Sequence, residues 1–438
     1  FSALRAKLLE LEPIDIAHFM DSQLDEATQL VFFRLLPKEF ASDVFIELDA
    51  DEQERLIRAF TDKELKEVID DMYLDDMVDV IDEMPANVVK RILSSAEPAE
   101  RTLINKLLEY PDDSAGSLMT PEFVSLRELM TVGEAFDLIR EQGPNKETIY
   151  TCYVTNDRKK LLGVVTVRTL LLADRNAQIK SIMQPNVIKV DTLEDKETVA
   201  KVFQKYDFTA LPVVDKEGCI VGIVTIDDAV DVIEEEATED IQKMAAILPS
   251  DEPYLKQSVW SIWKSRMPWL LLLMVSATFT GLIINHYEAT LNALSPLLFA
   301  CIPMLMDTGG NAGGQSSVTI IRSLALGDIE FRDIGKILWK ELRVAFFLSL
   351  LLACVCFAKL QLIDCLIFGY AYTPMMCLAV SLSLFVTIIV AKIVGCILPL
   401  LAKKCKLDPA VVASPFVTTI VDAIALMFYC FISIHLLA

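Results

Sequence analysis

The stretch IVGIVTIDDAVDVIEEEATEDIQKMA, residues 220–245, carries two patterns in succession. Its first residues form a short apolar run around Gly222, which predicts a buried β-strand. From Thr225 onward the apolar residues recur at helical spacing, and acidic residues fill the positions between them. The helix leads toward the first long apolar segment of the chain. We therefore expect it to connect a domain that contains strands to a membrane domain.

The acidic residues of this helix indicate cation binding. Four of them lie roughly along one stripe: Asp228, Asp231, Glu235 and Glu239. Carboxylates three or four residues apart on a helix repel one another. Hard divalent cations with oxygen ligands, Mg2+ among them, offset such repulsion. The helix is therefore placed to carry a metal signal to the membrane.

Charge divides the chain near residue 264. The 438 residues carry a net charge of −22, but only 12 of the 40 basic and 9 of the 62 acidic residues lie at or beyond Lys264. The first 263 residues therefore hold 28 basic and 53 acidic side chains. This excess argues against nucleic acid as a partner, since phosphate binding needs Lys and Arg patches, and it suits cations. Ordinary solvating charge is the alternative interpretation.

Five apolar segments are long enough to span a membrane, which takes about 20 apolar residues. They cover roughly residues 267–285, 291–321, 342–362, 373–402 and 410–437. Ten of the twelve basic residues of this half fall on one side of the bilayer. The positive-inside rule then places the acidic half in the cytosol and the C-terminus outside. The ten cysteines form no CxxC pair, which fits a reducing compartment.

Polar residues interrupt two of these segments. The second contains MDTGGNAGGQSS (306–317), with Asp307 and Asn311, and the fifth contains Asp422. An intramembrane carboxylate normally faces a cavity, an ion path or a partner charge, so we expect Asp422 to face water or an ion. The glycines are expected to expose carbonyls and to break or thin the helix, which requires burial or a pore. Lys392 matches Asp307 in depth, and the two predict either a salt bridge or a shared ion path.

Residues 1–112 predict an array of short helices. Segments such as LPKEFASDVFIEL, TDKELKEVIDDM and PANVVKRILSS recur about every twelve residues. Each opens near a Pro or Asp at a cap position and has apolar residues at helical spacing. Short helices stacked in this way form a small superhelix. One helix has an acidic face with Asp75, Asp76 and Asp79, for which solvation is the simplest interpretation.

Residues 113–237 contain the same sequence pattern twice. TIYTCYVTNDRKKLLGVVTVRTLL and FTALPVVDKEGCIVGIVTIDDAVDVI each have an apolar strand, a polar turn, a Gly-led strand and a helix, and a Met-x-Pro stretch precedes each. This arrangement resembles a tandem pair of CBS domains, a family that commonly binds adenine nucleotides. The ribose-binding Thr/Ser-x-x-Asp of that family matches Thr225 and Asp228, whereas Thr169 replaces the Asp in the first copy. The resemblance implies at most one complete nucleotide site and leaves ATP open as a ligand.

The order of an acidic helical array, a CBS pair, an acidic connecting helix and five spans resembles the MgtE family of magnesium channels over essentially the whole chain. The most specific segments are EEATEDIQKMA (235–245), TGGNAGGQS (308–316) and LDPAVVASPFVTTIVDA (407–423). The resemblance implies a homodimer with one central pore lined by the second and fifth spans. In that pore Asp422 is the carboxylate and Asn311 offers a polar contact.

The resemblance also implies closure by intracellular Mg2+, which bridges carboxylates of the helical array, the CBS pair and the connecting "plug" helix. The acids in matching positions are Asp228, Asp231, Glu234, Glu236, Glu239 and Asp240, and Asp75, Asp76 and Asp79 are the candidates in the array. The charges of Asp307 and Lys392 depart from the familiar pattern. A sodium- or proton-coupled divalent cation transporter or exporter on the same scaffold therefore stays open as the alternative.

We therefore expect a multidomain α-helical membrane protein with Mg2+ as substrate and regulator. Its parts are a helical superhelix (1–112), an α/β CBS pair (113–176 and 177–237), a connecting helix (238–263) and a five-helix pore domain (264–438). The resemblance implies the bacterial plasma membrane. An enzyme is not expected, because the three histidines form no HExxH motif. An anion channel is disfavoured, because its pore needs basic groups where this chain has Asp422.

Overall fold

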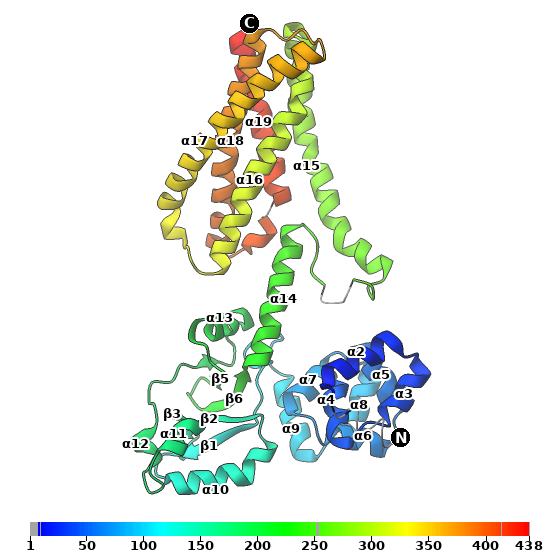
Figure 1. The fold of residues 1–438 in the computed structure, drawn as a ribbon, viewed down its shortest axis with the longest axis vertical. Coiled ribbons are helices and arrows are strands. Elements are labelled where there is room, and N and C mark those ends of the chain that lie inside the picture. The colour runs from blue at the N-terminus through cyan, green and yellow to red at the C-terminus, as the bar shows by residue number, and fades with distance from the viewer. Residues whose placement is uncertain (1–7, 9, 251–253, 413, 438) are drawn as a thin grey trace. The chain divides into compact units, whose positions relative to one another are not determined.

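The computed structural model describes residues 8, 10–250, 254–412 and 414–437. The chain folds into two compact units, Phe1–Glu234 and Glu235–Ala438. The first contains short helices and two small sheets, and the second contains long helices (Figure 1). This matches the fold class expected from the sequence.

The N-terminal part of the first unit, which we call the N domain, is an array of short helices. They are α2 (Pro13–Gln23), α3 (Glu26–Phe33), α4 (Lys38–Ile46), α5 (Ala50–Ala59), α6 (Asp62–Ile69), α7 (Leu74–Asp82), α8 (Ala86–Ser95) and α9 (Pro98–Leu107). Pro, Asp or Thr precedes or opens most of them, as expected of helix starts. The rings of Phe33, Phe45 and Phe60 pack against one another in the core.

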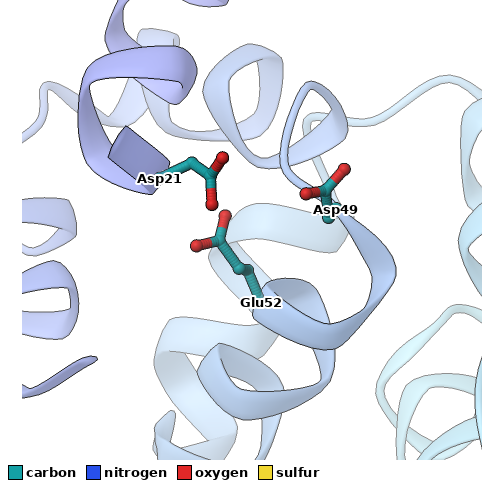
Figure 2. A group of neighbouring side chains, drawn as sticks. All are labelled: Asp21, Asp49 and Glu52. Carbon is teal, nitrogen blue, oxygen red and sulfur yellow. The ribbon is translucent and has the colours of Figure 1, made fainter. Parts of the chain in front are cut away.

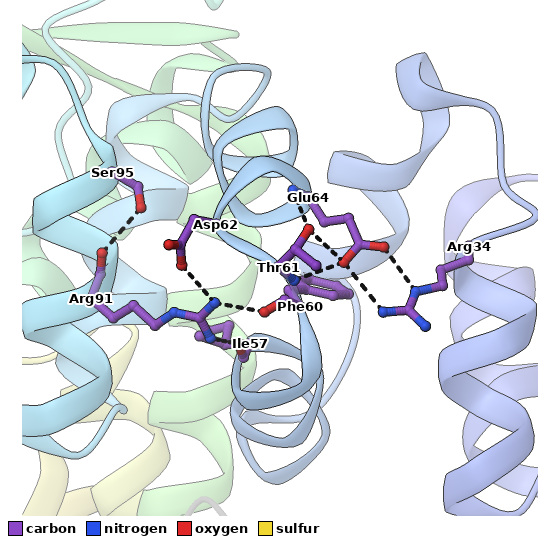
Figure 3. Close-up of polar contacts among 8 residues, drawn as sticks. All are labelled: Arg34, Ile57, Phe60, Thr61, Asp62, Glu64, Arg91 and Ser95. Carbon is purple, nitrogen blue, oxygen red and sulfur yellow. Dashed lines mark hydrogen bonds and ion pairs between the residues drawn. The ribbon is translucent and has the colours of Figure 1, made fainter.

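Polar side chains fix the corners between these short helices (Figure 3). Thr61 and Glu64 form a reciprocal capping box at the start of α6, and Arg34 reaches Glu64 from α3 at 2.9 Å. From α8, Arg91 donates to the carbonyl oxygens of Ile57, in the last turn of α5, and of Phe60, the C-cap residue of this helix. A cation at a helix C-terminus satisfies carbonyls that have no partner within the helix.

Two three-stranded sheets of equal topology follow. They contain β1 (Phe123–Arg127), β2 (Thr148–Thr155) and β3 (Leu161–Thr166), and β4 (Val190–Asp191), β5 (Ala210–Val214) and β6 (Ile220–Thr225). In each sheet the first pair of strands is parallel and the second pair antiparallel. The accompanying helices are α10 (Val132–Gln142), α11 (Val167–Leu172), α12 (Ile179–Ile182) and α13 (Lys196–Tyr206). The repeated sequence pattern thus corresponds to two copies of one fold.

Helix α14 (Ile226–Met244) follows β6 directly, as the opening stretch of sequence predicts. Its first turns belong to the first unit and its later turns to the second. The second unit continues with α15 (Val259–Leu294), α16 (Ile302–Ala325), α17 (Ile334–Lys359), α18 (Pro374–Lys404) and α19 (Ser414–Leu437). A 3-10 segment, η2 (Pro296–Cys301), precedes α16, and a π-helical segment, η4 (Leu360–Ile367), extends α17.

Within the described residues, four of these helices are long and apolar enough to cross a membrane: α15, α17 with its flanks, α18 and α19. The expected second span does not run from residue 291, because α15 continues to Leu294 and α16 begins at Ile302. The expectation that the glycines break or thin this span is also wrong. Helix α16 is a continuous α-helix through Gly309–Gly314, because its glycines are packed against α18 and α19.

Candidate cation sites

An acidic pocket of roughly 430 Å3 lies in the first unit. Its walls come from the start of α2, from α4, from the start of α7 and the residues before it, from the residue before β2 and from the β6–α14 junction. Among the side chains that the structure describes, nine carboxylates and no Lys or Arg line it: Glu12, Asp43, Glu47, Asp71, Asp75, Asp76, Glu147, Asp227 and Asp228. We call this cavity the acidic pocket.

Local helix starts hold two of its walls in place. Asp75 and Asp76 occupy the first turn of α7, where the backbone N–H of Leu74 donates to Glu122 at 3.1 Å. At the start of α14, the Thr225 hydroxyl donates to Asp228 Oδ2 at 2.6 Å. The Thr225 backbone N–H donates to the same oxygen at 3.3 Å. The Asp228 carboxylate therefore has a defined direction before any cation binds.

The electrostatics of the pocket disfavour bare carboxylates. Burial, and then repulsion from Asp228 and Asp227, raises the pKa of Asp76 to about 7. Burial, and then repulsion from Asp76, Asp227 and Asp228, raises the pKa of Glu147 to about 7 as well. Burial followed by repulsion from Asp76 and Asp228 raises the pKa of Asp75 well above its ordinary value.

Two carboxylate oxygens of the pocket are buried without a hydrogen-bond partner in the described structure, Asp75 Oδ1 and Glu147 Oε2. Buried polar atoms normally have partners. Hard divalent cations take carboxylate oxygens as ligands and often retain several waters. The orphaned oxygens, the repulsion and the lack of basic residues among the described lining all suit such a hydrated cation.

The regulatory residues expected from the sequence do not form one cluster. Asp75, Asp76 and Asp228 line the acidic pocket, Asp228 repels Asp79, and Asp231 repels Glu47. Glu234 is exposed at the end of the first unit. The remaining three lie on the later turns of α14, in the second unit: Glu236, Glu239 and Asp240.

Glu239 has a cationic partner of its own. Lys243 Nζ lies 2.6 Å from Glu239 Oε1 and 2.7 Å from Asp408 Oδ2, in the connection between α18 and α19. Met244 packs in the same place against Ile321 and Ala410. Within the second unit, the end of α14 is thus tied to the segment that leads into α19.

Sequence reasoning missed five acids of the pocket: Glu12, Asp43, Glu47, Asp71 and Glu147. They come from several separate segments of the chain and stand in ordinary amphipathic surroundings, so no local pattern marks them as one site. Thr225 and Asp228, expected as nucleotide ligands, are hydrogen-bonded to each other within this pocket. In the first copy the equivalent Thr166 and Thr169 hydroxyls lie 3.0 Å apart. The carboxylates around Thr225 favour a cation over a phosphate at this position.

The second unit has its own polar face. Asp307, Asn311 and Gln315 are four residues apart on α16, so they share one face, and all three are exposed in the single chain. The glycines lie on the opposite, buried face. A Cβ on Gly310 would lie 3.1 Å from Thr418 and 3.8 Å from the Asp422 carboxylate, so α16 and α19 meet closely here.

Asp422 is half-buried on α19 and is repelled by Asp307. The structure therefore brings together the carboxylates of Asp307 and Asp422 and the backbone of Gly310. Lys392 is not part of this group, and the expected pair between Lys392 and Asp307 is not formed. Lys392 is buried on α18 and pairs at 4.0 Å with Glu341 of α17, whose Oε2 also accepts from the Ser316 hydroxyl at 3.0 Å.

Comparison with known proteins covers nearly the whole chain. Family sequence models match for MgtE, a divalent cation transporter (residues 302–432), for the MgtE intracellular N domain (11–113) and for the CBS domain (115–176 and 179–235). A magnesium transporter MgtE of Thermus thermophilus is 37% identical across 98% of this chain and 93% of its own length. One of Bacillus subtilis is 31% identical across 97% and 92%.

Among solved structures, the cytosolic domain of the Mg2+ channel MgtE in complex with ATP is similar to this chain. It is 39% identical, with a TM-score of 0.51, and the match covers 53% of this chain and 94% of the other. The crystal structure of the soluble part of a magnesium transporter gives the same TM-score at 32% identity.

Proposed function

Because the chain belongs to the MgtE family, whose members are membrane transporters rather than enzymes, we propose that it is a Mg2+-selective channel for magnesium uptake that intracellular Mg2+ closes. The observation that carries this proposal is the acidic pocket, with its repelling and partly orphaned carboxylates. A bacterial plasma membrane location, with the first unit in the cytosol and the C-terminus outside, belongs to the same proposal.

The pore of this channel contains Asp422 and Asn311. Asp307, Asn311 and Gln315 leave a polar stripe exposed on α16, and such a stripe is costly against lipid. A second copy of the chain related by a two-fold axis would cover it and enclose a polar path. Asp422 lies against the backbone of Gly310 beside this path. A carboxylate with nearby polar groups suits a cation that keeps most of its waters.

Closure of the channel follows if Mg2+ binding is coupled to the conformational equilibrium of the first unit. Mg2+ can shift a conformational equilibrium only by binding one state more tightly than the other. In the described state the pocket carboxylates of the N domain and of the β6–α14 junction lie close enough to repel one another. Mg2+ replaces that repulsion with shared coordination and so favours this state. Loss of Mg2+ leaves the repulsion, which drives the two walls apart.

The remaining acids of α14 extend this regulation toward the second unit in our proposal: Asp231, Glu234, Glu236, Glu239 and Asp240, with Asp79 on the N-domain side. Glu239 acts there with Lys243 and Asp408 rather than alone. ATP is a further candidate ligand of the CBS pair at Thr225 and Asp228. Its phosphates require a bound cation to approach the acidic pocket.

A sodium- or proton-coupled divalent cation transporter is the second candidate. The observation that favours it is the buried pair of Lys392 and Glu341 among membrane helices. Charged groups in such positions commonly belong to ion or proton pathways.

Currents across a planar bilayer distinguish the two candidates. The full chain is reconstituted with Mg2+ as the only permeant cation, and cytosolic Mg2+ is raised from micromolar to about 10 mM. We expect currents that cytosolic Mg2+ closes and that Asp422→Ala abolishes, while Asp328→Asn, in the exposed segment after α16, leaves them intact. Asp228→Asn should raise the half-closing Mg2+ concentration about tenfold, which corresponds to about 1.4 kcal/mol of coupling. Mg2+ flux without current that depends on a sodium or proton gradient would contradict the channel and support the second candidate.

A further inference from the structure

We propose that Asp21, Asp49 and Glu52 form a divalent cation site inside the N domain, separate from the acidic pocket. One carboxylate oxygen from each lies within 4.8 Å of the other two. Asp21 comes from the last turns of α2, Asp49 directly precedes α5, and Glu52 lies in the first turn of α5 (Figure 2). None of the three lines the acidic pocket.

Glu52 distinguishes this group from an ordinary acidic surface. It is only 4% exposed, whereas a carboxylate is rarely buried without compensation. Its Oε1 accepts a hydrogen bond of 2.7 Å from Gln29, which is itself buried and also donates to the Met20 carbonyl. Its Oε2 is buried without a hydrogen-bond partner in the described part of the chain. In Figure 2 the carboxylates of Asp21 and Glu52 point toward one another.

Gln29 acts as an orienting group. Its amide donates to one oxygen of Glu52 and so restrains the orientation of this carboxylate, as outer-shell partners of metal ligands commonly do. Arg55 lies 3.5 Å from the same oxygen, Oε1, and its closer partner is Glu26 at 2.6 Å. The neighbouring cation thus leaves Oε2 for another partner.

The side chain of Asp49 does not cap helix α5, although the residue is in the position to do so. It occupies the N-cap position of α5, where an aspartate side chain normally accepts from the helix backbone. Asp25 does so at the start of α3, but the side chain of Asp49 makes no such hydrogen bond. Its carboxylate remains within reach of Glu52 and Asp21.

Three carboxylate oxygens are hard ligands, which select Mg2+, Ca2+ or Mn2+ over softer metals. A cation bound by all three would join the end of α2 to the start of α5, two elements that are separate in the sequence. It would also replace the repulsion between Asp21 and Glu52, which contributes to raising the pKa of Glu52 after burial itself. The competing arrangement is a single proton shared by these two carboxyl groups.

Mn2+ is the probe that tests the site. The full chain in detergent is freed of metal with EDTA, and bound Mn2+ is counted from the loss of the electron paramagnetic resonance signal of free Mn2+. Thermal unfolding is followed with and without Mn2+. The variants are Glu52→Gln and Asp49→Asn. Asp51→Asn is the matched control, because Asp51 is exposed in the same helical turn but lies outside the group.

We expect Glu52→Gln and Asp49→Asn each to lose one bound Mn2+ per chain and part of the Mn2+-dependent rise in Tm, while Asp51→Asn behaves like the parent. Mn2+ bound in the acidic pocket contributes equally to the Mn2+ count and the Tm of every variant, so it does not affect the differences between variants. Full Mn2+ binding in both variants overturns the proposal. Should Glu52→Gln instead raise the metal-free Tm with no loss of Mn2+, a shared proton is the explanation. Asp49→Asn carries the test if the buried Glu52 variant fails to fold.

Discussion

Asp76 and Asp228 repel each other across the acidic pocket, although they lie in the first turns of two helices, α7 and α14, far apart in the sequence. Together with burial, this repulsion raises the pKa of Asp76 to about 7. The first unit thus keeps an unfavourable interaction that a proton or a cation relieves. Its stability should therefore respond to both.

Asp76→Asn should raise the Tm of the metal-free protein but reduce the rise in Tm that Mg2+ produces. Without Mg2+ the variant loses repulsion, and we expect Tm to rise by about 2–4 °C, the shift typical of ~1 kcal/mol for a unit of this size. With 10 mM Mg2+ the variant has one ligand fewer, so the Mg2+-dependent rise in Tm should shrink. Thermal unfolding of the full chain measures both effects.

The exposed Asp112, which lies outside the acidic pocket, supplies the control for this comparison. Asp112→Asn makes the same change of charge and should leave both Tm values close to those of the parent. An equal response of the two variants would mean that net charge, not the pocket, determines the effect.

The metal-free protein should lose stability as pH rises. Asp76 and Glu147 have folded-state pKa values of about 7, above their ordinary values near 4, because burial and neighbouring carboxylates disfavour their charged forms. Between pH 4 and 7 the folded state therefore binds more protons than the unfolded state. Raising the pH through this window lowers the free energy of unfolding, and the effect levels off above pH 7.

Mg2+ should reverse this trend, because its ligands must be deprotonated. We expect the Mg2+-dependent rise in Tm to be larger at pH 8 than at pH 5.5. Asp76→Asn should weaken the pH dependence in EDTA. A metal-free Tm that rises steadily from pH 5 to 8 would contradict the assignment of raised pKa values to the pocket.

Local sequence patterns, namely helical spacing with cap residues and a repeated strand segment, were sufficient to predict the fold. Helical spacing and cap residues mark α2–α9, and the repeated Gly-led strand phrases around Gly163 and Gly222 mark the two sheets. These signals are local, so they survive without knowledge of the tertiary structure. The boundaries of α15 and α16 were less predictable, because one apolar run contains both the end of a helix and the following 3-10 segment.

Partners brought together by packing were not predictable in the same way. Lys392 was matched to Asp307 by depth alone, but depth does not state which face of a helix a residue occupies. Asp307 shares the exposed face of α16 with Asn311, whereas Lys392 turns toward α17 and Glu341. Likewise, the effect of the α16 glycines depended on their neighbours, which fill the space and keep the helix continuous.

Removing one partner of the Lys392–Glu341 pair should be strongly destabilising. Lys392→Met leaves the Glu341 carboxylate and its Ser316 contact without a nearby cation in a buried setting, which typically costs about 3–5 kcal/mol. Replacing both by Met should recover most of this loss, because a buried pair is often neutral relative to apolar residues. Unfolding of the detergent-solubilised parent, the two single variants and the double variant measures the coupling between the two residues. Recovery of Lys392→Met by Asp307→Asn, but not by a change at Glu341, would restore the pairing expected from the sequence.

Gly395→Ala should destabilise the second unit through the crossing of α16 and α18. A Cβ at Gly395 would overlap the carbonyl oxygen of Gly313, which is backbone and cannot move aside without shifting a helix. Such overpacking typically costs about 1–3 kcal/mol. Gly281→Ala is the matched control, since nothing lies within 4 Å of its Cβ and α15 continues on both sides. The control should be neutral or slightly more stable, because Ala favours helix over Gly by about 0.5–1 kcal/mol. Equal unfolding temperatures for both variants would mean that α16 and α18 do not meet at these two glycines.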